Sequence, residues 1–194
     1  MDYNRTAKAR LATRLAFFAA GFSMGCCAPF FPFVKENVSA DKSQFGVLLL
    51  CLGIGAIIAM PITGILSAKR GSKPMVLLGG LSMVVLLPIL VVVNSPIILA
   101  LILFLFGAAL GTLDVAMNVH GVEVEQIEKR SLMSNFHAQF SIGGLVGAAL
   151  PPLVLNSSLC HTFTSISTCL LHELQESQYY LPSAWGGGSG GMSG

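Results

Sequence analysis

Asp114 is the only carboxylate within a long apolar stretch, residues 97–119. A stretch of this length and composition predicts a helix that spans a membrane. A charged side chain near the centre of such a helix costs roughly 3 kcal/mol on insertion scales, so it usually faces the protein interior and marks a pathway or a proton relay. Asp114 is therefore a candidate for binding and releasing a proton.

Small and polar residues share a helical face with Asp114. Gly107, Gly111, Asn118 and Gly121 follow one another along the helix, with Asp114, in steps of three or four residues. At 100° per residue these steps keep all five within an arc of about 80°. The other faces carry Leu, Ile, Phe and Val. The small and polar face predicts a helix–helix contact or the lining of a cavity.

Two interpretations of Asp114 stay open. The carboxylate either binds a proton as part of a function, or makes an interhelical hydrogen bond at a hydrated level of the membrane. Asp114 lies 17 positions after Ile97, which is about 26 Å along a helix and therefore nearer the inner face.

A second polar group begins the apolar segment 133–155. An imidazole titrates near physiological pH, so His137 is a candidate titrating partner for Asp114, and Ser141 extends the same ridge by one helical turn. A hydrated histidine at a helix end is the alternative. Gln139 and Asn118 are candidates for solute contacts or for hydrogen bonds between helices.

The composition defines the broad class. Hydrophobic residues make up 54% of the 194 residues and charged residues only 10%, unlike an ordinary soluble domain. The apolar stretches predict an all-α polytopic membrane protein with about five transmembrane helices. The basic segment 1–14 precedes them. The predicted spans are residues 15–34, 45–66, 75–93, 97–119 and 133–155.

Basic residues predict the orientation. With the N-terminus in the cytoplasm, nine Lys and Arg residues lie inside, and only Lys35 and Lys42 lie outside. We therefore expect a multi-pass protein of the cell's inner (plasma) membrane with a cytoplasmic N-terminus. A cleaved signal near Ser23 and Cys26 is the competing interpretation, but the apolar run continues to a full membrane length.

The last segment, residues 156–194, breaks this pattern. Ser, Thr, Cys and His dilute its apolar residues, and its end is rich in glycine. We expect an atypical polar tail, either disordered or containing a weak sixth helix. It is an expression scar, an altered reading frame or a natural tail.

Three pairs of glycines four residues apart occur within the predicted spans. Small residues at this spacing let membrane helices approach closely. These pairs predict a packed bundle rather than separate anchors. They are Gly21 with Gly25, Gly107 with Gly111, and Gly143 with Gly147.

Other chemistry finds little support in the sequence. The five cysteines form no C-x-x-C pair and have no His partner at metal spacing. No nucleophile elbow, H-E-x-x-H motif or phosphate loop occurs, and the cations are explained by membrane topology rather than by nucleic-acid binding. We expect no cofactor, no metal and no enzymatic activity. The segment 120–132, with its Glu, Lys and Arg residues, predicts a solvated loop helix.

The short basic loop between the second and third spans carries a resemblance. Gly64, Lys69, Gly71 and Lys73 fall at positions of the loop signature G-x-L-x-D-R-x-G-R-K, which is typical of the major facilitator superfamily. Ala68 stands at the acidic position and Ser72 replaces a later Arg. The resemblance implies a transporter built from two six-helix halves around a site at the membrane midplane.

A longer stretch is similar to helices 4 and 5 of the fucose-permease-like branch of that superfamily. It runs from Gly111 through Asp114 and Asn118, and then from Phe136 to Pro151. In that branch an acidic residue of helix 4 is implicated in proton coupling, and Asp114 falls on its position. A second carboxylate, on helix 1, would fall near residue 28, where this chain has Ala. This departure weakens a two-carboxylate relay and the inference of a sugar substrate.

The resemblance covers residues 10–155, the N-terminal half of such a transporter. It implies a proton-coupled secondary transporter of a small polar solute, with the lipid bilayer, protons and a partner half or oligomer as its partners. Two alternatives stay open: a truncated membrane protein that does not transport, and an intramembrane enzyme.

Overall fold

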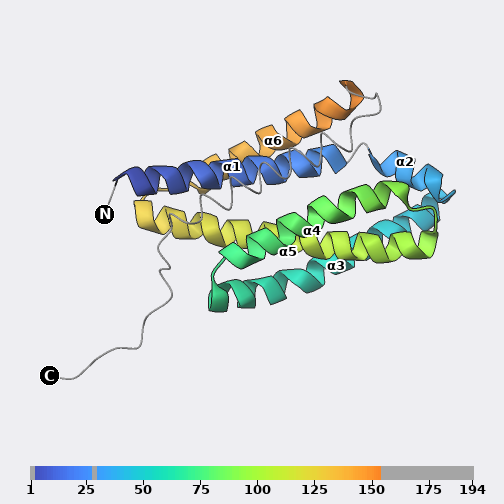
Figure 1. The fold of residues 1–194 in the computed structure, drawn as a ribbon, viewed down its shortest axis with the longest axis horizontal. Coiled ribbons are helices and arrows are strands. Elements are labelled where there is room, and N and C mark those ends of the chain that lie inside the picture. The colour runs from blue at the N-terminus through green and yellow to red at the C-terminus, as the bar shows by residue number, and fades with distance from the viewer. Residues whose placement is uncertain (1–2, 28–29, 154–194) are drawn as a thin grey trace.

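The computed structural model describes residues 3–27 and 30–153, which fold entirely into helices and short connections (Figure 1). The predicted all-α class is confirmed. The predicted tail, 156–194, lies outside the described residues. The helices are α1 (Tyr3–Cys27), α2 (Phe30–Asn37), α3 (Lys42–Arg70), α4 (Lys73–Val92), α5 (Pro96–Glu128) and α6 (Met133–Leu153).

Three of the described helices, α3, α4 and α5, are long and apolar enough to cross a membrane. A fourth span results if residues 13–27 of α1 and the short helix α2 count as one segment, which is bent by 43°. The predicted span 15–34 is therefore divided between two helices. Among the described residues α6 does not reach this level of hydropathy, because polar residues occupy its first two turns.

Helix boundaries follow local chemistry. The Asp41 carboxylate accepts a hydrogen bond from the Gln44 backbone N–H at 2.7 Å, and the Gln44 side chain accepts one from the Asp41 N–H at 3.2 Å. This reciprocal capping box starts α3. Helix α3 ends at Gly71, whose φ of +82° favours glycine. Helix α5 begins with Pro96 at its first position, where the missing N–H is not needed.

The end of α5 differs from the prediction. The loop helix predicted within 120–132 is continuous with α5 as far as Glu128, so α5 extends nine residues beyond the predicted boundary at Val119. Hydropathy locates the edge of the membrane but not the end of a helix, and Glu and Gln are good helix formers in water. Lys129, with a left-handed backbone at φ 52°, ends the helix.

Glycines bring two pairs of helices into backbone contact. In the pair α1 and α6, a Cβ atom added to Gly21 would overlap the Phe140 carbonyl oxygen, and one added to Gly143 would overlap the Phe18 carbonyl oxygen. In the pair α3 and α5, a Cβ atom on Gly107 would overlap the Leu52 carbonyl oxygen. Figure 1 shows α1 and α6 side by side, with α3, α4 and α5 grouped below them. Gly25, Gly111 and Gly147 also meet backbone atoms of the neighbouring helix.

The two pairs match residue by residue. Adding 86 to the number of a contact residue of α1 gives the residue that makes the same contact in α5. Subtracting 88 from the number of a contact residue of α6 gives the residue that makes the same contact in α3. The matched positions are Phe18 with Phe104, Gly21 with Gly107, Phe22 with Ala108, Phe140 with Leu52, and Gly143 with Gly55. Helices α1 and α5 are antiparallel, since Arg10 near the start of α1 contacts Glu128 at the end of α5. The bundle therefore contains an inverted structural repeat.

Apolar side chains fill the space between the pairs. One buried cluster joins α1, α4, α5 and α6 around Phe17, Phe106 and Phe136, and Phe17 and Phe136 stack with ring centroids 5.4 Å apart. A second cluster, around Val34, Leu99 and Leu103, holds α2 against α4 and α5. The first cluster thereby holds the pair α1 and α6 against α4 and α5.

We predict that Gly107→Ala destabilises the bundle by about 1–3 kcal/mol, the usual cost of overpacking, because the new methyl group meets backbone atoms that cannot rotate away. Gly53→Ala is the matched control: it adds the same methyl group to α3, where no atom lies within 4 Å. The control should be neutral or slightly stabilising. Unfolding by sodium dodecyl sulfate in mixed micelles measures both variants, and an equal loss in the two would contradict the close contact.

Candidate functional site

Asp114 lies half-buried in the C-terminal half of α5. The Asn118 side-chain amide donates a hydrogen bond to the Asp114 backbone carbonyl at 2.8 Å and approaches the carboxylate oxygen Oδ1 at 3.4 Å. The two residues are one helical turn apart, so their side chains share a face. Asn118 therefore restricts the orientation of the carboxylate.

The face of α5 that carries Asp114 changes neighbours along its length. Gly107 and Gly111 contact the α3 backbone at Leu52 and Ala56. A Cβ atom on Gly121 would lie 2.9 Å from the Met133 sulfur, at the start of α6. Asp114 and Asn118 are situated between these two contacts, where α5 passes from α3 to the pair α1 and α6.

The polar ridge of α6 lies elsewhere. His137 is exposed, and its ring packs edge-on against Phe17 of α1 with centroids 5.5 Å apart. The Ser141 hydroxyl donates to the His137 carbonyl at 3.1 Å, and Gln139 is half-buried. Among the hydrogen bonds and ion pairs of the described residues, none joins this ridge to Asp114.

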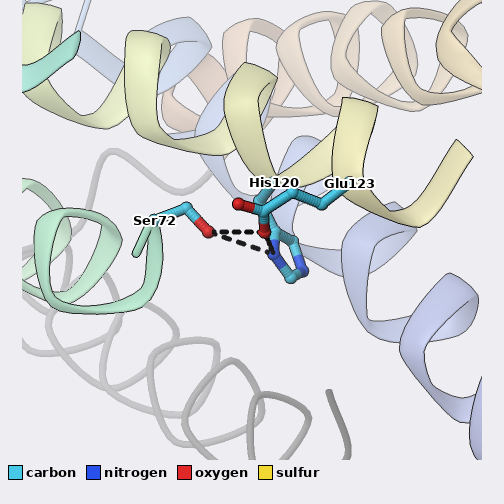
Figure 2. Close-up of polar contacts among 3 residues, drawn as sticks. All are labelled: Ser72, His120 and Glu123. Atoms are coloured by element: carbon cyan, nitrogen blue, oxygen red, sulfur yellow. Dashed lines mark hydrogen bonds and ion pairs between the residues drawn. The ribbon is translucent and has the colours of Figure 1, made fainter. Parts of the chain in front are cut away.

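The structure instead brings together three residues that sequence reasoning did not select. Figure 2 shows Ser72, at the start of α4, beside His120 and Glu123 of α5. The Ser72 hydroxyl donates to Glu123 Oε2 at 3.1 Å and lies 3.4 Å from His120 Nδ1. His120 Nδ1 lies 3.6 Å from Glu123 Oε2. Ser72 and His120 are buried, and Glu123 is half-buried.

Hydrogen bonding in this cluster favours a charged carboxylate. Glu123 lies in the extension of α5, beyond the apolar stretch that ends at Val119. The hydrogen bond with His120 lowers the pKa of the Glu123 carboxyl below its ordinary value. Burial opposes this shift, while the charge of His120 and the hydroxyl of Ser72 add to it. Glu123 is thus held as an anion beside the imidazole.

The two other acidic residues of this extension also have partners. Glu128 forms an ion pair with Arg10 of α1 at 3.1 Å, and Glu125 Oε1 accepts the Leu132 backbone N–H at 2.8 Å. The predicted solvated loop helix is therefore a packed end of α5. The i, i+3 spacing of His120 and Glu123 was the available signal. It was overlooked because the helix was expected to end at Val119.

The residues of the basic loop have different roles. Gly71 is required by its backbone, at φ +82° and ψ 162°, whereas a Cβ atom on Gly64 would meet nothing within 4 Å. Lys69 is exposed in the last turn of α3, where a cation complements the helix dipole. Lys73 is the first residue of α4 and has a polar partner. Ser72, which replaces a basic residue of the family signature, is the one that contacts α5.

Within residues 3–27 and 30–153, no group of three or more His, Cys, Asp or Glu side chains is placed to hold a metal ion. The cysteines of these ranges, Cys26, Cys27 and Cys51, are free. Cys160 and Cys169 fall outside the described residues.

Membrane-length helices joined through glycines, with a half-buried carboxylate on one of them, define a multi-pass helical membrane protein. The family model of the major facilitator superfamily matches residues 14–165. The chain belongs to that superfamily, as the loop signature suggested.

Curated relatives agree with this family. The chain is similar to an uncharacterised MFS-type transporter of Yersinia pestis, with 48% identity over 72% of this chain and 36% of the relative. It is 40% identical to an uncharacterised transporter of Sinorhizobium fredii, over 69% of this chain and 35% of that protein. It is 30% identical to the membrane protein MosC of Rhizobium meliloti, over 70% and 33%. The chain thus spans about a third of the length of these relatives. No solved structure matches it.

We predict that Gly71→Ala destabilises the protein by about 1–3 kcal/mol, because an L-residue is strained at this φ and ψ. The matched change Gly64→Ala, in the same motif, should leave stability the same or slightly higher, since its surroundings are open. Thermal unfolding in detergent measures both. If Gly64→Ala proved the more harmful change, this account of the two motif glycines would be wrong.

Proposed function

We propose that this chain forms part of the N-terminal helical bundle of a secondary transporter that moves a small polar solute together with protons. Membership of the major facilitator superfamily and the two relatives named as transporters support this function over an intramembrane enzyme. The observation that carries the proposal is the half-buried carboxylate of Asp114, within an apolar helix and bonded to Asn118.

In this proposal Asp114 is the proton-binding group. A carboxylate inside a membrane helix is costly when charged and much less so when protonated. The charged carboxylate therefore keeps this face of α5 in hydrated surroundings, whereas the protonated group can enter apolar ones. The Asn118 amide lies 3.4 Å from this carboxylate, so a movement of α5 or of its surroundings would change the contacts that the group makes. This difference in interaction is what couples proton binding to a change of conformation.

The inverted repeat bears on the proposed fucose-permease-like branch. The position 86 residues before Asp114 is residue 28, which is Ala. This is the position near which that branch carries its second carboxylate. Residue 28 lies outside the described residues, but the absence of a carboxylate from the sequence at this position supports a mechanism in which Asp114 acts without a second acid on the first span. His137, Gln139 and Ser141 remain candidates for solute contacts from α6.

A complete pathway would need more helices than the described bundle contains. Transporters of this type bind solute between two halves that rock against each other, and the chain spans about a third of its relatives. We propose that a partner half, or a further copy in an oligomer, supplies the other wall. A fragment that does not transport is the alternative, and flux measurements distinguish the two.

We also propose that the N-terminus lies in the cytoplasm and that the protein resides in the inner (plasma) membrane. The Arg10–Glu128 ion pair and the contact of Ser72 with α5 gather the start of α1, the α3–α4 junction and the end of α5 at one end of the bundle. These segments carry the basic residues that are typical of cytoplasmic loops.

We predict that Asp114→Asn abolishes uphill, proton-driven uptake while leaving exchange of solute across the membrane intact. The amide mimics a protonated carboxyl group, and exchange needs no net release of the proton. The measurement uses proteoliposomes with an imposed pH gradient and candidate sugars and organic ions, and counterflow assays for exchange.

The matched control is Glu36→Gln, which neutralises an exposed carboxylate on α2. It should transport as the unmodified protein does. Equal proton-driven uptake by Asp114→Asn and the unmodified protein would rule out the proton-site assignment. Absence of any flux from well-folded protein would favour the non-transporting fragment.

The orientation predicts opposite labelling of two exposed positions at the two ends of α3. In a background without native cysteines, Lys42→Cys should react with an impermeant maleimide in intact cells. Arg70→Cys should react only after the cells are permeabilised. The reverse pattern would mean that the N-terminus lies outside.

A further inference from the structure

Arg14 of α1 is a half-buried cation without a counter-ion among the described residues. Its Nε atom is buried and has no hydrogen-bond partner there. A charged group that is withdrawn from water is costly unless it is paired. A guanidinium group is always charged in proteins and presents five N–H donors in a fixed fork. Arg14 therefore needs an anionic acceptor.

The helices around Arg14 explain why no acid of the protein fills this role. Neither α1 nor α6 contains an aspartate or a glutamate. The glutamates in the extension of α5, Glu123, Glu125 and Glu128, are already bonded to other groups. An anion that balances the charge of Arg14 therefore comes from outside these three helices.

The register of α1 against α6 places Arg14 at the edge of the apolar region. Gly21 contacts Phe140 of α6, and the contacts of the following turns run in the same direction along both helices. Arg14 and Met133 lie seven residues before these two, where the predicted apolar segments begin. Seven residues are about two helical turns, so Arg14 stays on the side of α1 that faces α6. Lipid headgroups lie at this level of a membrane.

Two exposed cations lie close to the same level. Lys129 and Arg130 occupy the junction between α5 and α6, within four residues of Met133. The positive end of the α6 dipole adds to their charge. Phosphate oxygens accept charge-assisted hydrogen bonds from arginine in a forked geometry. The half-buried guanidinium group and the two exposed cations therefore suit the phosphate of a lipid headgroup.

We propose that Arg14, together with Lys129 and Arg130, binds the phosphate group of an anionic phospholipid at the end of the bundle where α1 and α6 begin. The bound phosphate bridges α1 to the α5–α6 junction. This site goes beyond the proposed transport function and does not depend on it, because it requires only that the bundle spans a membrane.

Native mass spectrometry of the full chain, released from detergent micelles with added lipid, tests the site. We expect phosphatidylglycerol to bind more tightly than phosphatidylcholine, which carries no net charge. Arg14→Gln should weaken the binding of phosphatidylglycerol about tenfold, the effect of losing one charge-assisted hydrogen bond. The matched control is Arg70→Gln, which removes an exposed cation at the end of α3 and should retain the binding. Inorganic phosphate at the same concentration should not displace the lipid.

Thermal unfolding in detergent separates lipid binding from a structural role of Arg14. Without anionic lipid, Arg14→Gln should unfold at the same temperature as the unmodified protein or at a higher one, because it removes an unpaired half-buried charge. Phosphatidylglycerol should raise the unfolding temperature of the unmodified protein and of Arg70→Gln, but not that of Arg14→Gln.

Four results would overturn the proposal. Equal loss of binding in Arg14→Gln and Arg70→Gln would indicate a general effect of surface charge, and equal affinity for the two lipids would exclude selection of an anion. Displacement of the lipid by inorganic phosphate would indicate a site for a free anion. A loss of stability in Arg14→Gln without lipid would mean that Arg14 has its partner within the protein.

Discussion

Contact between helix backbones is the constraint on which the rest of this bundle depends. In lipid, apolar side chains gain little from burial against one another, so helices associate through close packing and polar contacts. Gly21 and Gly143 join α1 to α6, and Gly55 and Gly107 join α3 to α5. Each of these glycines lies where a side chain would enter the neighbouring backbone. With the two pairs fixed in this way, the aromatic cluster around Phe17 and the register of every polar residue follow.

Polar contacts within the apolar part of the bundle differ from those at the end of the bundle. Within the membrane the α3–α5 contact contains one buried hydroxyl pair, Thr63 with Thr112 at 3.1 Å, and α5 carries the single acid Asp114. At the C-terminal end of α5, by contrast, the extension of the helix bonds to α1 and to the α3–α4 junction through charged groups. Close packing through glycines thus sets the position of the helices relative to one another, and charged groups set the position of their ends. Asp114 lies between the closely packed part of α5 and its charged extension.

Hydropathy and glycine spacing predicted the helical class and the positions of the long apolar segments, and the resemblance of the basic loop to a family signature predicted the family. The ends of the helices were harder to predict, because an apolar pattern stops at the membrane edge while a helix of Glu, Gln and Val continues in water. The contacts of His120 and Glu123 were missed for the same reason, since a solvated loop helix is not expected to pack against α4. A pairing such as Arg10 with Glu128, 118 residues apart, depends on tertiary packing that no local pattern records.

Because α5 is one continuous helix, a tilt near its middle displaces its C-terminal end. Fourteen residues separate Asp114 from Glu128, which is about 21 Å of continuous helix. A tilt of about 10° with its pivot at Asp114 would displace the far end by about 4 Å, more than the 3.1 Å that separates the ion-paired atoms of Arg10 and Glu128. A small rearrangement around one carboxylate would thus be transmitted mechanically to the far end of α5, without any chain of intermediate side chains.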